Sequence, residues 1–214
     1  RCASGLAPRR EPQANAGPLA SAAMSRLPAD AGALLAQSLR AGRIHSAYLL
    51  SGPGDAPREA ARGFARALVC EAGGEQPCES CSACQRSAAD DSSIALDGAG
   101  KKGPLYRHIG DHPDLLWLER GHGDTRVRIG QIRALQAALR LRSSGDGRRA
   151  AVCADAEWLN HEAQNALLRL LEEPPPRTTL VLVARSASGL LATLRSRCQR
   201  LRFPEPALRP HLEP

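Results

Sequence analysis

Four cysteines lie close together in the first half of the chain, with the spacing C-x7-C-x2-C-x2-C over Cys70, Cys78, Cys81 and Cys84. Four thiolates at this spacing can surround one tetrahedral Zn²⁺, because a tight turn brings neighbouring sulfurs to the same point. Two disulfides or an iron–sulfur cluster are the other chemistries open to four clustered thiols. In a reducing compartment thiols stay unpaired, so we favour zinc. With sulfur at every ligand position no place is left for a reactive water, and the predicted role is structural.

The loop 52–59 lies between a predicted strand and a predicted helix, which is the position of a phosphate-binding P-loop. It opens with Gly52, Pro53 and Gly54, and glycines there let backbone N–H groups curl around a phosphate. The rest of the loop is altered. Arg58 stands where a P-loop has its lysine, and Glu59 stands where it has the hydroxyl that binds Mg²⁺. An ordinary Gly-Pro turn between strand and helix is the other interpretation.

Asp155 ends another apolar run, at the position where a Walker B aspartate would hold Mg²⁺. The next residue in an active ATPase is a glutamate that polarises the attacking water, but here it is Ala156. A helix N-cap is the simpler role for Asp155, and the two roles can coexist. Because both halves of the hydrolytic site are altered, we expect no ATP hydrolysis by this chain.

The elements that must position these residues alternate along the chain. Apolar residues at helical spacing predict helices over residues 31–43, 58–70, 129–141, 161–173 and 190–195. Asp30 is the expected N-cap of the first helix. Short continuous apolar runs predict strands over residues 45–50, 114–118, 149–154, 179–184 and 199–203. Such strands alternating with helices are typical of a parallel sheet covered on both faces, so we predict a three-layer α/β fold.

The composition is that of a folded domain. The chain has 214 residues, 43% of them hydrophobic and 24% charged, with a net charge of +7. No apolar run is long enough to cross a membrane, and residues 1–23 lack the apolar segment of a signal peptide, so we expect a cytoplasmic protein. We interpret residues 1–23 as a disordered leader before a start at Met24, and residues 24–203 as the domain. Within it we expect a zinc module over residues 70–84 and a polar surface insertion over residues 85–110.

Two short motifs point to a known family. Residues 165–175 read NALLRLLEEPP, and this helix resembles the NALLKxLEEPP signature of bacterial clamp-loader subunits of the AAA+ superfamily. Ser196, Arg197 and Cys198 match the SRC motif of the same proteins. The cysteine loop and the following residues 112–114 (His-Pro-Asp) also fit, so the resemblance runs from about residue 43 to residue 203. The alterations at Arg58, Glu59 and Ala156 resemble the delta prime type rather than the gamma/tau type, which keeps an intact P-loop.

The resemblance implies a P-loop NTPase fold of the AAA+ class and a subunit of DNA polymerase III that does not hydrolyse ATP. It also implies partners: gamma/tau and delta subunits, and through the complex the sliding clamp and primed DNA. Arg197 would be an arginine finger acting on the ATP site of a neighbouring subunit, although from its sequence context alone it could be any surface arginine. Cys70, Cys78, Cys81 and Cys84 would be the zinc ligands, and residues 204–214 would begin a lid domain that the chain does not complete.

Two other functions stay open at this point. An active clamp-loader ATPase of the gamma/tau type would have to turn over nucleotide despite Arg58 and Ala156. A zinc-bearing nucleic-acid-binding module on a borrowed P-loop fold would show salt-dependent binding of DNA by the isolated chain. The arginines are dispersed along the sequence, which makes the second alternative the weaker one.

Overall fold

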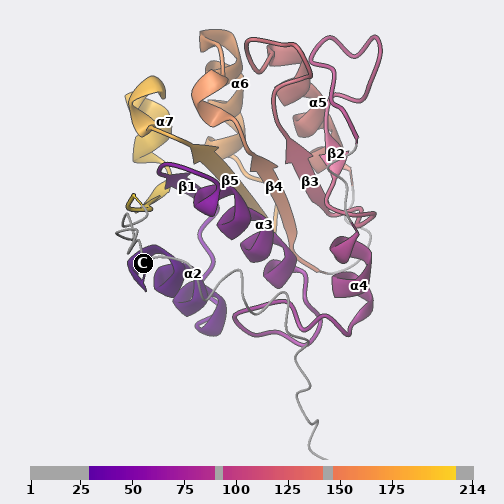
Figure 1. Cartoon of the computed structure of the whole chain (residues 1–214), viewed down its shortest axis with the longest axis vertical. Helices are drawn as coiled ribbons and strands as arrows, with labels where there is room; N and C mark the ends of the chain where they lie inside the picture. Colours follow the sequence, from indigo (N-terminus) through magenta and orange to yellow (C-terminus); the bar gives the residue numbers. More distant parts are fainter. Residues whose placement is uncertain (1–28, 90–93, 142–146, 206–214) are drawn as a thin grey trace, which may run out of the picture.

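The computed structural model describes residues 29–89, 94–141 and 147–205. Their centre is a six-stranded sheet with the order β2-β3-β4-β5-β1-β6 (Figure 1). Every neighbouring pair is parallel except β2 with β3. The strands are β1 (Ala47–Ser51), β2 (Arg107–His108), β3 (Leu115–Leu118), β4 (Arg149–Cys153), β5 (Thr178–Ala184) and β6 (Gln199–Arg202).

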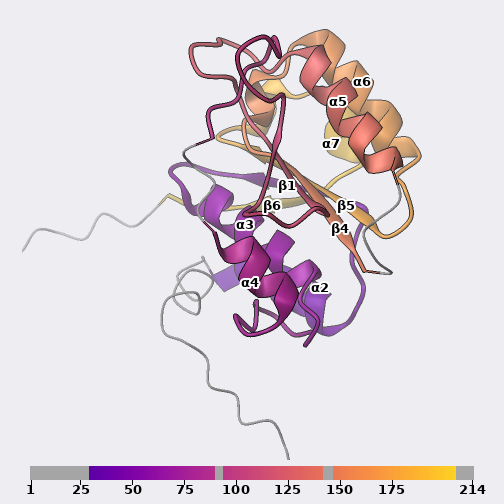
Figure 2. The same ribbon diagram turned by 90° about the vertical axis from the view of Figure 1, so that its right-hand side faces the viewer.

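Helices cover both faces of the sheet, which gives the three layers that the sequence predicts (Figure 2). One face carries α2 (Ala29–Arg40), α3 (Ala56–Leu68) and α4 (Ser82–Ala88), and the other carries α5 (Ile129–Arg140), α6 (His161–Glu172) and α7 (Ala192–Ser196). Two short 3-10 turns, η1 (Ala156–Trp158) and η2 (Ala187–Gly189), follow β4 and β5. No helix among these described segments is long and apolar enough to cross a bilayer.

The core is split in two by the sheet, because successive side chains of a strand point to opposite faces. In β1, Tyr48 and Leu50 pack on the α2–α3 side, whereas Ala47 and Leu49 pack on the α5–α6 side. All of β3, β4 and β5 is buried, as expected for strands covered on both faces. Continuous apolar runs therefore predict these three strands correctly.

Two features of the described chain differ from the expectations. α2 begins at Ala29, so Asp30 lies inside its first turn rather than at the N-cap. The sheet is not wholly parallel: β2 pairs antiparallel with β3, with Arg107 opposite Trp117. This short strand falls in the segment 85–110, which we expected to lie on the surface, and it closes one edge of the sheet. The leader 1–23 and most of the segment 204–214 lie outside the described residues.

The order of the strands creates a point where a crevice must open. β1 and β5 are neighbours, but β1 is followed by α3 on one face and β5 by α7 on the other. In open α/β sheets, ligands bind at the carboxyl ends of the strands at such a switch point. The loop 52–59 begins there, and Asp155 follows β4 at the same edge.

Candidate functional site

A cavity of about 340 Å³ lies at the switch point. Its walls come from the loop after β1, from the ends of β4 and β5, and from Arg120 after β3. The loop residues Gly52 and Arg58 and the predicted Walker B residue Asp155 all line it. The structure therefore brings Arg58 and Asp155 to one cavity, whereas Pro53 and Glu59 are exposed and are not among its lining residues.

Arg58 and Asp155 are bonded to each other in this cavity. Nη1 of Arg58 lies 3.1 Å from Oδ1 of Asp155, whose side chain is only 14% exposed. The second oxygen of Asp155 accepts a hydrogen bond of 3.0 Å from the backbone N–H of Arg120. Asp155 is the N-cap residue of η1, but its side chain makes no capping hydrogen bond there. Its carboxylate is engaged by the chain's own cations at the position where a Walker B residue would face Mg²⁺.

The ion pairs continue to Glu119, at the end of β3. Its carboxylate pairs with both Arg58 and Arg107 and accepts a hydrogen bond of 2.9 Å from Nε1 of Trp117. Burial alone would raise the pKa of Glu119, but the hydrogen bonds from Arg107 and Trp117 and the nearby positive charges outweigh burial and lower it. Glu119 is therefore a carboxylate at neutral pH, and Arg58 is neutralised from two directions.

The backbone of the loop is also committed to contacts within the chain. The N–H of Gly52 donates to the carbonyl of Ala184 at 3.1 Å, and the N–H of Glu59 donates to the carbonyl of Asp55 at 2.9 Å. Pro57, in the first turn of α3, has no N–H to offer. A P-loop holds phosphate with backbone N–H groups. Because these N–H groups are already bonded within the chain, the loop has fewer donors for a ligand. Glu59 is exposed at the start of α3.

Gly52 is required here by a close approach to the last strand. A Cβ at this position would lie 2.5 Å from the carbonyl oxygen of Phe203 and 2.7 Å from its Cβ. The N–H of Phe203 in turn donates to the carbonyl of Ser51 at 2.7 Å. The glycine that opens the loop thus lets the chain after β6 pack against β1.

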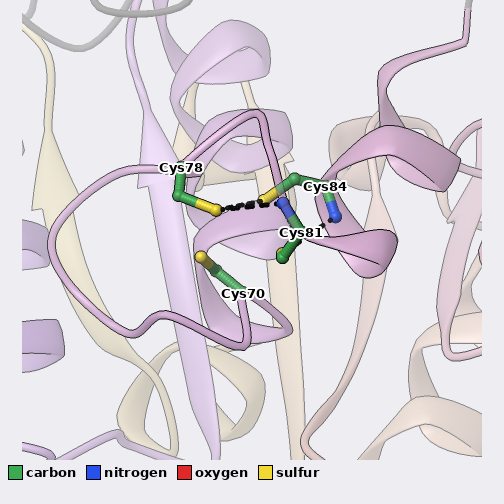
Figure 3. Close-up of side chains that lie close together, drawn as sticks. All are labelled: Cys70, Cys78, Cys81 and Cys84. Carbon is green, nitrogen blue, oxygen red and sulfur yellow. Dashed lines mark hydrogen bonds between the residues drawn. The ribbon is translucent and has the colours of Figure 1, made fainter. Parts of the chain in front are cut away.

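The four clustered cysteines form a second candidate site, a metal centre. Their sulfurs all lie within 4.8 Å of one another (Figure 3). Zinc–thiolate bonds of about 2.3 Å in a tetrahedron place sulfurs about 3.8 Å apart, so small adjustments accommodate the ion. Cys70 follows α3, Cys78 lies on the loop before α4, and Cys81 is the N-cap of α4. Cys84 lies in the first turn of α4, so a helix start presents two of the ligands.

The surroundings of the cysteines favour thiolates at part of the cluster. Cys78 Sγ accepts hydrogen bonds from the hydroxyl of Ser80 and the backbone N–H of Cys81, both at 3.4 Å, and these bonds lower its pKa to about 6. Burial raises the pKa of Cys70 and of Cys84. A bound cation would favour the thiolate at those two positions. Among the described residues all six cysteines are free thiols.

Arg197 lies at the C-cap of α7, between that helix and β6, as the sequence predicts. Its guanidinium donates to the carbonyl of Thr193 at 3.0 Å and pairs with Glu172 at 2.9 Å. The side chain is 39% exposed. Arg197 does not line the cavity that holds Arg58 and Asp155, so the two sites occupy different parts of the surface.

Sequence reasoning missed Glu119, Arg107 and Arg120, which extend the ion pairs around Arg58 and Asp155. A signal for Glu119 and Arg120 was present, because they directly follow the apolar run that forms β3. The carboxyl ends of parallel strands share one edge of the sheet, so residues after β3 must lie near those after β4. Arg107 comes from the two-residue strand β2, for which the sequence gives no pattern.

The strand order and the three layers define a mostly parallel α/β fold, which fits the AAA+ class. The fold agrees with the crystal structure of a DNA polymerase III gamma subunit-related protein from Thermotoga maritima, with a TM-score of 0.53 at 20% identity over 81% of this chain and 46% of that one. The family model for the DNA polymerase III delta subunit matches residues 28–95 and 106–207. The chain belongs to this family.

Curated relatives agree with the family assignment. The chain is 34% identical over 176 residues to the DNA polymerase III subunit delta' of Pseudomonas aeruginosa, covering 81% of this chain and 47% of that protein. It is 32% identical over 167 residues to the subunit delta' of Escherichia coli, covering 77% and 44%. The gamma/tau subunit of Mycobacterium tuberculosis matches at 31% identity over 79% of this chain and 26% of that protein. The chain spans about half the length of the delta' relatives.

Proposed function

We propose that this chain is part of a non-hydrolysing subunit of the bacterial DNA polymerase III clamp loader, which places the sliding clamp on primed DNA. One observation carries the proposal: in a chain of the delta family, Arg58 and Asp155 bond to each other across the cavity where an ATPase would hold nucleotide and Mg²⁺. Ala156 is buried and apolar where an ATPase needs a carboxylate. The chain would act in the bacterial cytoplasm with gamma/tau and delta subunits as partners.

The catalytic contribution of the subunit would be made in trans. Arg197, at the end of α7, would be an arginine finger that stabilises the charge developing on the γ-phosphate at the ATP site of a neighbouring gamma or tau subunit. Its exposure and its place at a rigid helix end support this role. The four clustered cysteines would hold one structural Zn²⁺, supported by the 4.8 Å limit on their sulfur separations.

ATP turnover tests the proposal. The full-length protein that contains this chain should show no turnover alone, and it should stimulate turnover when mixed with gamma and delta subunits, the clamp and primed DNA. Arg197→Ala should slow that stimulated turnover several-fold, because one ATP site loses a cation from its transition state. Arg200→Ala, at an exposed arginine of β6, is the matched control and should leave turnover unchanged.

Other outcomes would replace the proposal. Turnover by the purified protein alone would favour an active ATPase of the gamma/tau type. Equal rates with Arg197→Ala and the unaltered protein would remove the finger role. Tight, salt-dependent binding of DNA by the isolated chain, without any effect on the loader, would favour a zinc-bearing DNA-binding module.

A further inference from the structure

The guanidinium of Arg197 is held by two acceptors that come from different helices. Nη1 donates to the carbonyl of Thr193 in α7 at 3.0 Å. Nη2 lies 2.9 Å from Oε1 of Glu172, the last residue of α6. Glu172 belongs to the LEEPP motif (residues 171–175), which the proposed function leaves without a role.

The backbones that carry the two side chains are fixed relative to each other. Leu171, next to Glu172, and Leu194, three residues before Arg197, are buried in the same hydrophobic cluster. Figures 1 and 2 show α6 and α7 on the same face of the sheet. The N–H of Arg197 donates to the carbonyl of Leu194 at 3.1 Å, which ties the arginine to the end of α7. The distance between the two side chains is therefore set by packed elements.

The Glu172–Arg197 pair is poorly suited to stabilising the fold. The two side chains are 49% and 39% exposed, and pairs at such exposure contribute little to stability in water. The pair restricts the long side chain of Arg197. An unpaired arginine samples many rotamers, and binding a phosphate group would cost it that freedom. Two contacts on separate nitrogens of the planar fork fix its plane as well as its position, and further N–H groups of the fork can still bind phosphate oxygens.

We propose that Glu172 is a positioning residue for Arg197, which orients the guanidinium at the end of α7 before a partner's nucleotide site meets it. The inference rests on the proposed function of Arg197 and adds a task for the LEEPP motif. Glu172 acts through Arg197 and touches no substrate. Its effect should appear in the rate of the chemical step at the partner's site rather than in nucleotide affinity, because pre-orientation lowers the cost of reaching the transition state.

Glu172→Gln in the full-length protein, reconstituted with gamma, delta, clamp and primed DNA, tests this assignment. We expect kcat for ATP to fall about two- to fivefold, the range that an exposed ion pair can supply, with KM for ATP unchanged. In an Arg197→Ala background the same substitution should change nothing further, because the two residues act as a unit. Glu173→Gln removes the neighbouring exposed carboxylate and is the matched control, with no expected effect.

Each alternative outcome has a separate meaning. If Arg197→Ala slows the loader but Glu172→Gln does not, the positioning role is wrong while the proposed function stands. A faster loader with Glu172→Gln would also overturn it, since Glu172 would then compete with phosphate for the arginine. If Arg197→Ala itself has no effect, the arginine-finger role of Arg197 is wrong, and the positioning role of Glu172, which depends on it, is wrong as well. Assembly of each variant loader is checked by gel filtration, and a fall in kcat that persists in the Arg197→Ala background would assign Glu172 to folding or assembly instead.

Discussion

The guanidinium of Arg58 lies 3.1 Å from the carboxylate of Asp155, which is 97 residues away in the sequence. In an active P-loop ATPase the residues at these two positions face each other across nucleotide and metal. Here they meet directly, and Glu119, the residue after β3, pairs with the same guanidinium. The Arg58 guanidinium is therefore paired with two carboxylates of the chain itself.

Removing Arg58, the cation that pairs with both Asp155 and Glu119, should destabilise the fold. Arg58→Ala leaves two carboxylates, Glu119 and Asp155, with fewer partners, and should lower the free energy of unfolding by about 1–2 kcal/mol after allowance for partial exposure. Urea denaturation measures this change. Arg133→Ala, at an exposed arginine of α5, should stay within about 0.5 kcal/mol of the unaltered chain. Equal effects of the two substitutions would mean that the Arg58 contacts contribute nothing.

The lowered pKa of Glu119 makes part of the stability dependent on pH. The stability that the Glu119 carboxylate contributes is complete above its ordinary pKa of 4.5. It is lost as the pH falls through the lower pKa that Glu119 has in the folded chain. Glu119→Gln should therefore cost about 1–2 kcal/mol at pH 7, and the difference from the unaltered chain should shrink as the pH falls below about 4.5. Denaturation curves at several pH values measure it, with Glu173→Gln as the exposed control. A difference that stays constant with pH would contradict the lowered pKa.

Gly52 and Gly54 should respond differently to the same substitution. Gly52→Ala places a methyl group 2.5 Å from the carbonyl oxygen of Phe203, so β6 or β1 must shift, and we expect a loss of about 2–3 kcal/mol. Gly54→Ala meets nothing within 4 Å and is strained only by its φ of +69°, so about 1 kcal/mol is expected. Thermal denaturation of both variants tests whether Gly52→Ala loses more stability than Gly54→Ala. A larger loss at Gly54 would show that the Phe203 contact is easily relieved.

The cysteine cluster should bind one Zn²⁺ per chain. Cys78→Ser should lower the zinc content measured by atomic emission and also lower Tm, because a structural ion contributes folding free energy. Cys153→Ala removes a sulfur from β4 and should leave the zinc content unchanged, whatever its effect on Tm. Iron in place of zinc, or full zinc content in Cys78→Ser, would refute the assignment of these four ligands.

The sequence was sufficient for the features that repeat or cluster along it. Continuous apolar runs such as residues 179–184 predict the parallel strands, and the spacing of Cys78, Cys81 and Cys84 predicts their convergence. The strand before Arg58 and the helix that contains it are also predicted from such local patterns. In each case the signal lies within a few residues, where periodicity and spacing are informative.

The rest depends on contacts between distant residues. β2 has two residues and exists because Arg107 and His108 meet β3, which no local pattern encodes. The pairing of Arg197 with Glu172 depends on the packing of α7 beside α6. No pattern in the sequence around either residue predicts it. α4 is a seven-residue helix within a stretch of cysteine, serine and alanine, too short for a clear helical period.

The Arg58–Asp155 pair also has a consequence for how the domain responds to its surroundings. A protein that is stabilised by a bound ligand gains stability in proportion to the logarithm of that ligand's concentration. Contacts between side chains of one chain carry no such dependence. The stability that the Arg58–Asp155 pair contributes is therefore present in the chain without any bound ligand.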